Sequence, residues 1–271
     1  MINRKALRHL AHEIVPPFVM RAMRCFGPVF FSGNFHTWDE ALKASAGYDA
    51  PAILDKVKAS LLKVKSGAAI YERDSVLFDE VEYSWPLLTA LLWIASNKEG
   101  SLNLVDFGGS LGSSYYQNRK FISHLSSVQW HIVEQPSFVR CGRQYFEDDV
   151  LRFHDSLESC LEQSSSDTII LSSVLQYISE PLKLIKKVID NNFEYVLIDR
   201  TPFIAKGPDR ITVQHTSSEI YKASYPAWFF NERSFLANFE ELYDMTAAFD
   251  APIDMANIPS SYKGYIFRRK T

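Results

Sequence analysis

Short apolar runs and helical apolar spacing alternate along the second half of the chain. Five runs have the length and composition of buried strands, and each ends beside polar or turn-forming residues. They cover residues 102–105, 128–133, 150–153, 168–171 and 195–198. Between the runs, apolar residues recur every three or four positions, as at Leu182, Ile185 and Val188, which predicts amphipathic helices. This alternation is typical of a parallel sheet covered by helices.

Two further β-type runs, residues 243–249 and 262–268, close the chain without a helical pattern between them. Strands joined in this way predict an antiparallel hairpin at the edge of the sheet. We therefore expect an α/β fold with a Rossmann-like, seven-stranded, mostly parallel sheet and an antiparallel C-terminal hairpin. An insertion at about residues 203–230 follows the fifth strand, at the side of the sheet where α/β proteins bind ligands.

The first hundred residues carry mostly helical patterns. We expect a helical N-terminal region over residues 1–100, with a segment that closes a site, and a main domain over residues 101–271. Residues 1–31 form a basic amphipathic arm that packs on its own domain or lies on an anionic membrane surface or a partner. Residues 71–80 place Tyr71 and several charges ahead of an apolar helix, so this segment is either a solvated loop or part of a site.

A glycine-rich turn follows the first strand of the main domain. Asp106 ends the strand, and Gly108, Gly109 and Gly112 precede the next helical pattern. Glycine is needed where backbone turns tightly against a ligand, although an ordinary turn would look similar. Glu134 lies 22 residues beyond Gly112, at the end of the second strand, where a carboxylate can accept both ribose hydroxyls of a nucleoside. Together these residues predict a nucleoside cofactor.

Composition, net charge and cysteine spacing limit which classes of protein and of binding partner fit the sequence. The 271 residues are 46% hydrophobic and 23% charged, which is ordinary for a globular protein with a large core. A net charge of −3 argues against general nucleic-acid binding. Cys25, Cys141 and Cys160 are too widely spaced for a disulfide framework or a CxxC metal site, so a reducing cytoplasm is expected. Neither a spanning apolar run nor a signal-peptide pattern is present, and the basic arm leaves contact with the inner membrane face as an alternative.

The chain resembles class I S-adenosylmethionine-dependent methyltransferases. Residues 106–112 look like the first motif of that family, with Ser110 in place of its middle glycine. Residues 71–78, 106–115 and 225–229 look more closely like a poorly characterised group of bacterial methyltransferases found among polysaccharide-biosynthesis genes. The resemblance implies S-adenosylmethionine as cofactor and a small-molecule or carbohydrate acceptor.

The resemblance also implies roles for individual residues. The glycines and Asp106 of the first motif would lie at the methionine part of the cofactor, and Glu134 would hold the ribose. Ser172 and Ser173 would line the sulfonium end, and Arg73 would pair with the cofactor carboxylate. Asp155 would border the adenine, or else lie in a plain helix cap.

Methyl transfer to a hydroxyl requires alignment, exclusion of water and removal of a proton. His215, in the insertion, and Asp199, after the fifth strand, are the two candidate bases, and a surface or substrate-binding histidine is the alternative for His215. Tyr71, Tyr225 and Trp228 are candidate substrate-binding residues, with packing as the alternative. No metal site is expected, since His154, Asp155 and Asp199 do not have ligand spacing.

We therefore expect O-methylation of a sugar, glycolipid or surface-polysaccharide precursor. One alternative is an NAD-dependent oxidoreductase, but its Gly-x-Gly-x-x-Gly spacing would need glycine at Ser110 and Ser113. Another alternative is a non-catalytic nucleoside-binding scaffold. The fold does not choose the acceptor, because function lies in the site rather than in the fold.

Overall fold

The computed structural model describes residues 29–47, 50–73, 76–216, 223–251 and 256–271. Nearly all of the basic arm at residues 1–31 therefore lies outside the described residues. Seven strands of a ten-stranded sheet form its larger part, the main sheet, in the order β6, β5, β4, β7, β8, β12, β11. They are β4 (Ser101–Phe107), β5 (Ser127–Val133), β6 (Leu151–His154), β7 (Thr168–Ser172), β8 (Tyr195–Ile204), β11 (Tyr243–Asp250) and β12 (Ser261–Arg269).

The expected Rossmann-like sheet and C-terminal hairpin are both confirmed. The strands β4 to β8 are parallel, whereas β12 pairs antiparallel with β8 on one side and with β11 on the other. β12 is therefore inserted between β8 and β11, although it comes last in the chain. This antiparallel final strand distinguishes the sheet from the fully parallel sheet of other Rossmann-like proteins.

Helices cover both faces of the main sheet because its strands are apolar on both sides. Leu104 and Ile170 point into a core shared with one helical layer, while Val105 and Ile169 point into a core on the other face. The first layer comprises α4 (Ala50–Lys65), α5 (Trp85–Asn97), α6 (Ser113–Ile122) and α7 (Pro136–Tyr145). The second comprises α8 (Leu157–Gln163), α9 (Pro181–Asp190) and α10 (Glu232–Leu236). Among the described residues, no helix is both long and apolar enough to cross a membrane.

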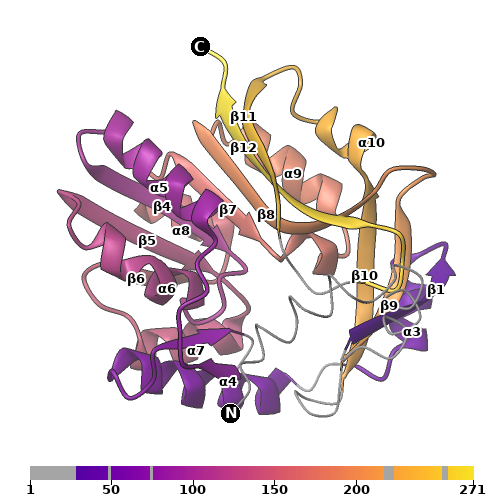
Figure 1. Ribbon diagram of the computed structural model, residues 1–271, viewed down its shortest axis with the longest axis horizontal. Helices are drawn as coiled ribbons and strands as arrows, with labels where there is room; N and C mark the ends of the chain where they lie inside the picture. The colour runs from indigo at the N-terminus through magenta and orange to yellow at the C-terminus, as the bar shows by residue number, and fades with distance from the viewer. Residues whose placement is uncertain (1–28, 48–49, 74–75, 217–222, 252–255) are drawn as a thin grey trace, which may run out of the picture.

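The region after β8 and part of the front region form strands. β9 (Arg210–Thr216) and β10 (Ser224–Asn231) pair antiparallel, and β1 (Val29–Phe35) pairs with β9. β10 joins the main sheet only at Phe203 and Ile204 of β8. Figure 1 shows this β1–β9–β10 group together with α3 (Trp38–Ala44) at one end of the molecule, away from β5 and β6.

A short hairpin, β2 (Tyr71–Arg73) and β3 (Val76–Phe78), occupies the charged segment ahead of α5. Tyr71 and Glu72 are buried, so this part of the segment is not a solvated loop.

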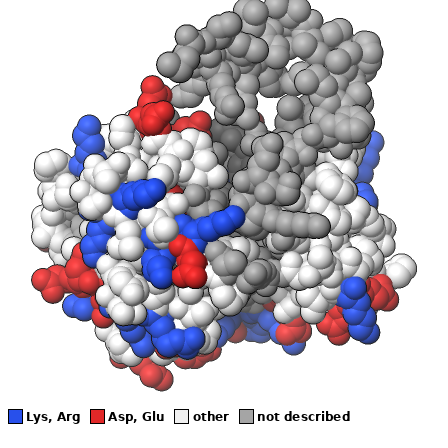
Figure 2. All heavy atoms as spheres, turned by 90° about the horizontal axis from the view of Figure 1, so that it is seen from below, with Lys and Arg blue, Asp and Glu red and all other residues white. Residues whose placement is uncertain are grey.

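The charged side chains on the face shown in Figure 2 are mixed: Lys and Arg are interspersed with Asp and Glu rather than gathered in one basic area.

Candidate active site

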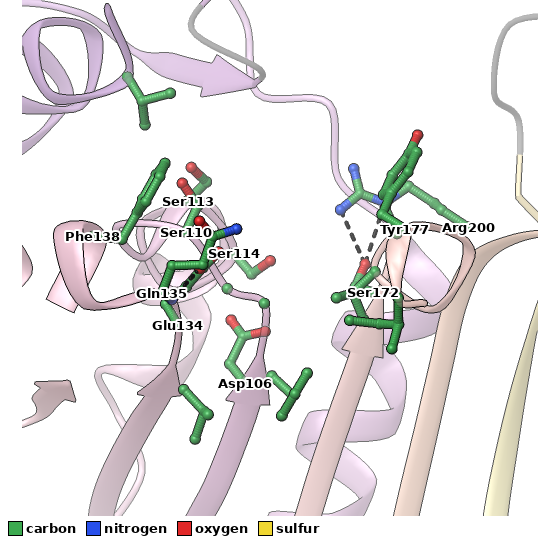
Figure 3. A pocket seen from close by; sticks show the side chains of 18 of the residues that line it. Asp106, Ser110, Ser113, Ser114, Glu134, Gln135, Phe138, Ser172, Tyr177 and Arg200 are labelled. Atoms are coloured by element: carbon green, nitrogen blue, oxygen red, sulfur yellow. Dashed lines mark hydrogen bonds between the residues drawn. The ribbon is translucent and has the colours of Figure 1, made fainter. Parts of the chain in front are cut away.

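A cavity of about 840 Å³ opens at the carboxyl ends of β4, β5, β6 and β7. This volume lies in the range of about 300–1,000 Å³ that small-molecule sites occupy. The ends of these parallel strands form one wall, and α3, α4, β2, β9 and β10 complete the enclosure. Figure 3 shows Asp106, Ser110 and Glu134 on one side of the cavity and Ser172, Tyr177 and Arg200 on the other.

The glycine turn lines the cavity between β4 and α6. Gly108 has φ +72°, and an added Cβ there would strike the side chain of Val174. At Gly109 an added Cβ would lie 2.6 Å from the carboxyl carbon of Asp106. Ser110, which stands where the family motif has glycine, adopts φ +55°, so the turn keeps the left-handed backbone without that glycine. Gly112, at φ +102°, lies outside the cavity lining and starts α6.

The Asp106 side chain packs against the backbone of this turn at Gly109. Its side chain is 2% exposed, and its Oδ2 accepts a hydrogen bond of 3.0 Å from Trp130 Nε1. Burial raises the pKa of Asp106 to about 6, against the stabilising effects of Trp130 and the Arg200 charge. The carboxylate thus borders both the glycine turn and the cavity.

Replacing Asp106 with asparagine should change how stability depends on pH. Because the pKa of Asp106 is about 6 in the folded chain and 3.8 ordinarily, the folded state binds this proton more tightly, and stability falls as pH rises through that interval. The variant keeps the acceptor for Trp130 but cannot ionise, so it should gain up to about 3 kcal/mol relative to wild type between about pH 4 and pH 7. Urea unfolding of both proteins across this interval measures the difference. Parallel pH curves would contradict the assignment.

Glu134 faces the turn from the end of β5. Its Oε2 accepts a 2.6 Å hydrogen bond from the backbone N–H of Gln135, and the backbone N–H of Ser110 also donates to this carboxylate. Burial raises the pKa of Glu134, while these two donors oppose the rise. The carboxylate therefore joins the end of β5 to the glycine turn.

The end of β6 forms the next part of the wall. Asp155 lines the cavity and lies 3.5 Å from Arg143 Nη2. The helix cap that was the alternative for Asp155 is made by Ser156, whose Oγ accepts from the backbone N–H of Ser159 at 3.1 Å. Asp155 is thus left at the cavity. Glu158 and Lys187 also line the cavity, and they form an ion pair that lowers the pKa of Glu158.

The β2 side contributes a buried carboxylate that was not among the expected site residues. Glu72 is 1% exposed and accepts a 2.8 Å hydrogen bond from Ser113 Oγ at the start of α6. Tyr71 OH accepts from Gln117 Nε2 at 3.1 Å. The β2 strand is therefore bonded directly to the helix that follows the glycine turn.

The ends of β7 and β8 form a hydrogen-bonded corner. Ser172 Oγ donates to Asp199 Oδ2 at 3.0 Å and accepts from Arg200 Nη2 at 3.0 Å. Asp199 is 1% exposed, and its Oδ1 has no hydrogen-bond partner among the described residues. Burial raises the pKa of Asp199, whereas Arg200, with its Nε 3.4 Å from Oδ2, opposes the rise. Ser172 and Arg200 line the cavity, and Asp199 lies behind them.

Three hydrogen-bonded polar side chains line the cavity on the same side as this corner. Tyr177 OH donates to Gln214 Oε1 at 3.0 Å, and Gln214 Nε2 donates to Tyr225 OH at 3.3 Å. All three residues line the cavity. The predicted substrate residue Tyr225 is therefore at the cavity, together with two residues that the sequence pattern did not single out.

His215 and Trp228 are placed elsewhere. Side chains alternate along β9, so Gln214 and Thr216 lie at the cavity while His215 lies on the other face. There it stacks on Phe30 with ring centroids 4.4 Å apart, and burial lowers its pKa. Trp228 packs on Trp38 and donates to the carbonyl oxygen of Ile178 at 3.0 Å, so packing accounts for it. Arg73 ends β2, and its side chain lies outside the described part of the structure.

Comparisons with known proteins give distant likenesses. No protein-family model and no curated protein matches the chain. The N-terminal domain of EvdMO1, solved in the presence of SAH and D-fucose, is 10% identical with a TM-score of 0.49 over 83% of this chain and 98% of that one. SAM-bound CalS10, an amino pentose methyltransferase from Micromonospora echinaspora, is 10% identical with a TM-score of 0.45 over 69% and 92%. The mitomycin 7-O-methyltransferase MmcR is 15% identical with a TM-score of 0.42 over 68% and 54%.

At TM-scores below 0.5 these likenesses carry no weight for the reaction or the acceptor. The sheet itself gives the fold, through the glycine turn after its first parallel strand and the antiparallel β12 between β8 and β11. By the order and direction of its strands, the chain has the Rossmann-like fold of class I S-adenosylmethionine-dependent methyltransferases.

Proposed function

We propose that the protein is an S-adenosylmethionine-dependent methyltransferase that acts on a hydroxyl group of a small-molecule or carbohydrate acceptor. One observation carries the proposal: the tight glycine turn and the Glu134 carboxylate meet in one cavity, at the carboxyl edge of a sheet with an inserted antiparallel strand. An oxidoreductase of the nicotinamide class is less well supported, because Ser110 and Ser113 stand where its motif needs glycine.

The first wall of the cavity suits the proposed cofactor. Glu134 would accept from the ribose hydroxyls, and Asp155 would border the base. The backbone at Gly108 and Gly109 would lie against the methionine part, since neither position has room for a Cβ. Glu72, a buried carboxylate on the β2 side, suits a cationic amine. When bound, S-adenosylmethionine would supply a methyl group activated by its cationic sulfur.

The second wall suits a polar acceptor. Tyr177, Gln214 and Tyr225 present hydroxyl and amide groups along one line, and Arg200 adds a guanidinium. Such groups match the hydroxyls of a sugar better than an apolar ring system. A sugar, glycolipid or surface-polysaccharide precursor remains the proposed acceptor class.

Asp199 is the proposed base, acting through Ser172. An acceptor hydroxyl at Ser172 Oγ would pass its proton to that oxygen while Ser172 passes its own proton to Asp199 Oδ2, which lies 3.0 Å away. Burial raises the pKa of Asp199, which makes its carboxylate a better proton acceptor, and the Arg200 charge limits this rise. His215 is not carried forward as a base, because it stacks on Phe30 away from the cavity.

Ligand binding tests the proposal directly. We expect S-adenosylmethionine and S-adenosylhomocysteine to bind with micromolar Kd in calorimetry and to raise the Tm, because both carry the nucleoside that Glu134 would hold. NADH fluorescence titrated under the same conditions should not change. Tighter binding of NADH, or neither heat nor a Tm shift with the two sulfur compounds, would overturn the proposal. A cytoplasmic location remains a prediction. Membrane contact through the basic arm is also a prediction, and liposome binding of the full chain can test it.

A further inference from the structure

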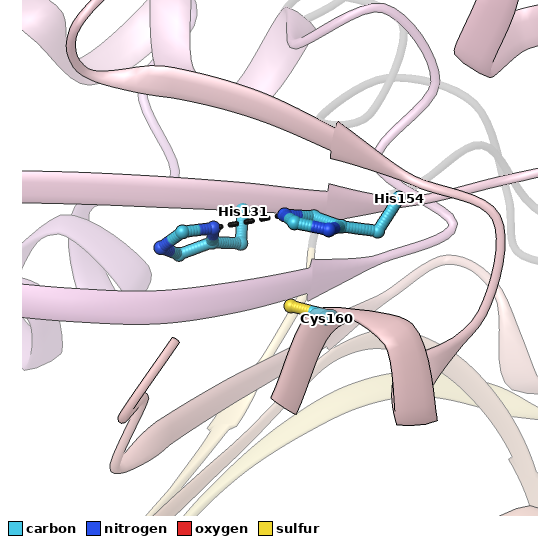
Figure 4. Close-up of side chains that lie close together, drawn as sticks. All are labelled: His131, His154 and Cys160. Carbon is cyan, nitrogen blue, oxygen red and sulfur yellow. Dashed lines mark hydrogen bonds between the residues drawn. The ribbon is translucent and has the colours of Figure 1, made fainter. Parts of the chain in front are cut away.

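Three side chains of the types that bind metal ions lie close together outside the cavity, on the face of the main sheet that α8 covers rather than the face that α4 to α7 cover. His131 lies on β5, His154 on β6 and Cys160 on α8 (Figure 4). In the parallel pairing of β5 with β6, His131 is opposite Arg152 and His154 is opposite Val133. The two histidines are therefore diagonal neighbours on one face. Leu157 and Cys160, three residues apart on α8, turn toward the same face as part of its core.

The three side chains are close together and almost fully buried. His131 Nδ1 lies 3.0 Å from His154 Nε2, and one ligand atom from each of the three residues lies within 4.8 Å of the other two. His131 is 6% exposed, His154 is 4% exposed, and Cys160 is fully buried. Figure 4 shows the sulfur of Cys160 on the inner side of α8, facing the strands that carry the imidazoles.

The charge states of the two histidines suit a metal ion, whereas Cys160 has to lose its proton on binding, because burial raises the pKa of its thiol to about 11. Burial lowers the pKa of His131 to about 4 and also lowers that of His154, which favours the neutral form of both rings. One neutral ring donates and the other accepts in the hydrogen bond between His131 Nδ1 and His154 Nε2, and a bound cation would replace this hydrogen bond. The nearby cations Arg143 and Arg152 have carboxylate partners, Asp155 at 3.5 Å and Glu147 at 3.6 Å. Repulsion of a bound cation by those guanidinium groups is therefore partly offset.

One buried nitrogen of the group lacks a hydrogen-bond partner. His154 Nδ1 is buried and has no hydrogen-bond partner among the described residues. A buried polar atom without a partner costs about 1–3 kcal/mol, and native proteins keep few of them. In the tautomer in which His154 Nε2 donates to His131, this nitrogen carries a free lone pair. That lone pair is a second observation, independent of the spacing of the three side chains, that indicates a ligand here.

We propose that His131, His154 and Cys160 bind a divalent cation of the zinc class. Two imidazoles and one thiolate are nitrogen and sulfur donors of the kind that Zn²⁺ takes, whereas Mg²⁺ and Ca²⁺ take oxygen. Binding replaces the thiol proton of Cys160 by the metal and releases that proton to water. The residues lie 23 and 6 positions apart in sequence, so no ligand spacing is visible there. The expectation of no metal site considered His154 only together with Asp155 and Asp199, not with His131 and Cys160.

The bound ion would fasten α8 to β5 and β6. β5 and β6 end at the cavity, where Glu134 follows β5 and Asp155 and Ser156 follow β6, and α8 begins there at Leu157. The cation would thus support the wall that the proposed cofactor lies against without touching the cofactor. The site itself rests on the three side chains alone and stands whether or not the protein transfers methyl groups.

Cobalt is the probe that tests the site. Co²⁺ added to the chelator-treated full chain should give visible d–d bands and a thiolate-to-cobalt charge-transfer band, with one ion per chain, and Zn²⁺ should bleach both. Cys160→Ser should lose the charge-transfer band. The double variant Cys25→Ser/Cys141→Ser is the matched control, because it keeps Cys160 alone and should retain the band. Absence of the band in wild type, or its persistence in Cys160→Ser, would overturn the proposal.

A stability measurement separates metal binding from misfolding. Without metal, Cys160→Ser should show the circular dichroism spectrum of wild type, because the substitution is small and the thiol is not a metal ligand in that state. Saturating Zn²⁺ should raise the Tm of wild type and of the Cys25→Ser/Cys141→Ser control by several degrees, through mass action on the folded state. It should leave the Tm of Cys160→Ser and His154→Gln unchanged. Equal shifts in all four proteins would show binding elsewhere and overturn the assignment.

Discussion

Replacing Asp199 with asparagine should lower the methyl-transfer rate by about 10²- to 10⁴-fold, the usual contribution of a general base. Asparagine has nearly the same shape and still offers an oxygen to Ser172, so the corner of β7 and β8 should keep its geometry. It cannot accept the proton that Ser172 passes on. The rate is measured as S-adenosylhomocysteine release with an acceptor found by screening sugars and sugar nucleotides.

The route through Ser172 makes this prediction specific. Ser172→Ala should reduce the rate to a similar extent, and the double variant should be no slower than either single one, because both residues serve one proton path. The affinity for S-adenosylhomocysteine should change little in all three proteins. Asp190→Asn is the matched control, since Asp190 is an exposed partner of Lys186 on α9. Additive losses would show that Asp199 and Ser172 act separately and would contradict the relay.

The pH dependence of the rate follows from the same assignment. A base must be ionised before it accepts a proton, so the rate should fall as pH drops through the pKa of Asp199. Burial raises that pKa above its ordinary value, which moves the fall toward neutral pH. In Asp199→Asn this acid limb should disappear.

Replacing Glu134 with glutamine should weaken S-adenosylhomocysteine binding by about 10²-fold or more, since hydrogen bonds to a charged group contribute about 1.5–3 kcal/mol each. The amide oxygen can still accept from the backbone N–H groups of Ser110 and Gln135, so the glycine turn should stay in place. The amide NH₂ has no lone pair for the second ribose hydroxyl. Calorimetry at a pH above the pKa of Glu134 measures the loss.

Two comparisons sharpen the Glu134 experiment. Glu162→Gln, at an exposed position at the end of α8, is the matched control and should bind like wild type. Adenosine should lose affinity in Glu134→Gln by nearly the same factor as S-adenosylhomocysteine, because both carry the ribose. A variant that loses S-adenosylhomocysteine but not adenosine would place Glu134 at the amino-acid part instead.

Features that depend on neighbouring residues were predictable from the sequence. The turn after β4 and the carboxylate after β5 each follow from a strand that ends in a particular residue type. Parallel strands end at one edge of a sheet, so a pattern read locally was enough to bring Gly108, Gly109 and Glu134 together. The closing hairpin was predictable for the same reason, because two strand patterns without a helix between them must return antiparallel.

Features that depend on strand direction or on distant pairing were not predictable in this way. His215 is one residue from Gln214, and only the alternation of β9 decides which of the two lies at the cavity. Arg200 follows Asp199 directly, but its φ of +51° is not visible in the sequence. Glu72 becomes a buried site residue only because β2 packs on α6, 41 positions later.

The two walls of the cavity draw on different strands. The wall assigned to the cofactor comes from the ends of β4, β5 and β6, whereas the opposite wall combines the ends of β7 and β8 with Gln214 of β9 and Tyr225 of β10. The strand pairing of β10 with β8 is limited to Phe203 and Ile204. Under the proposed function, exchanging the β9–β10 hairpin would replace Gln214 and Tyr225 on the acceptor side and leave the glycine turn and Glu134 in place. Transplanting this hairpin is therefore a direct way to redirect acceptor choice by engineering.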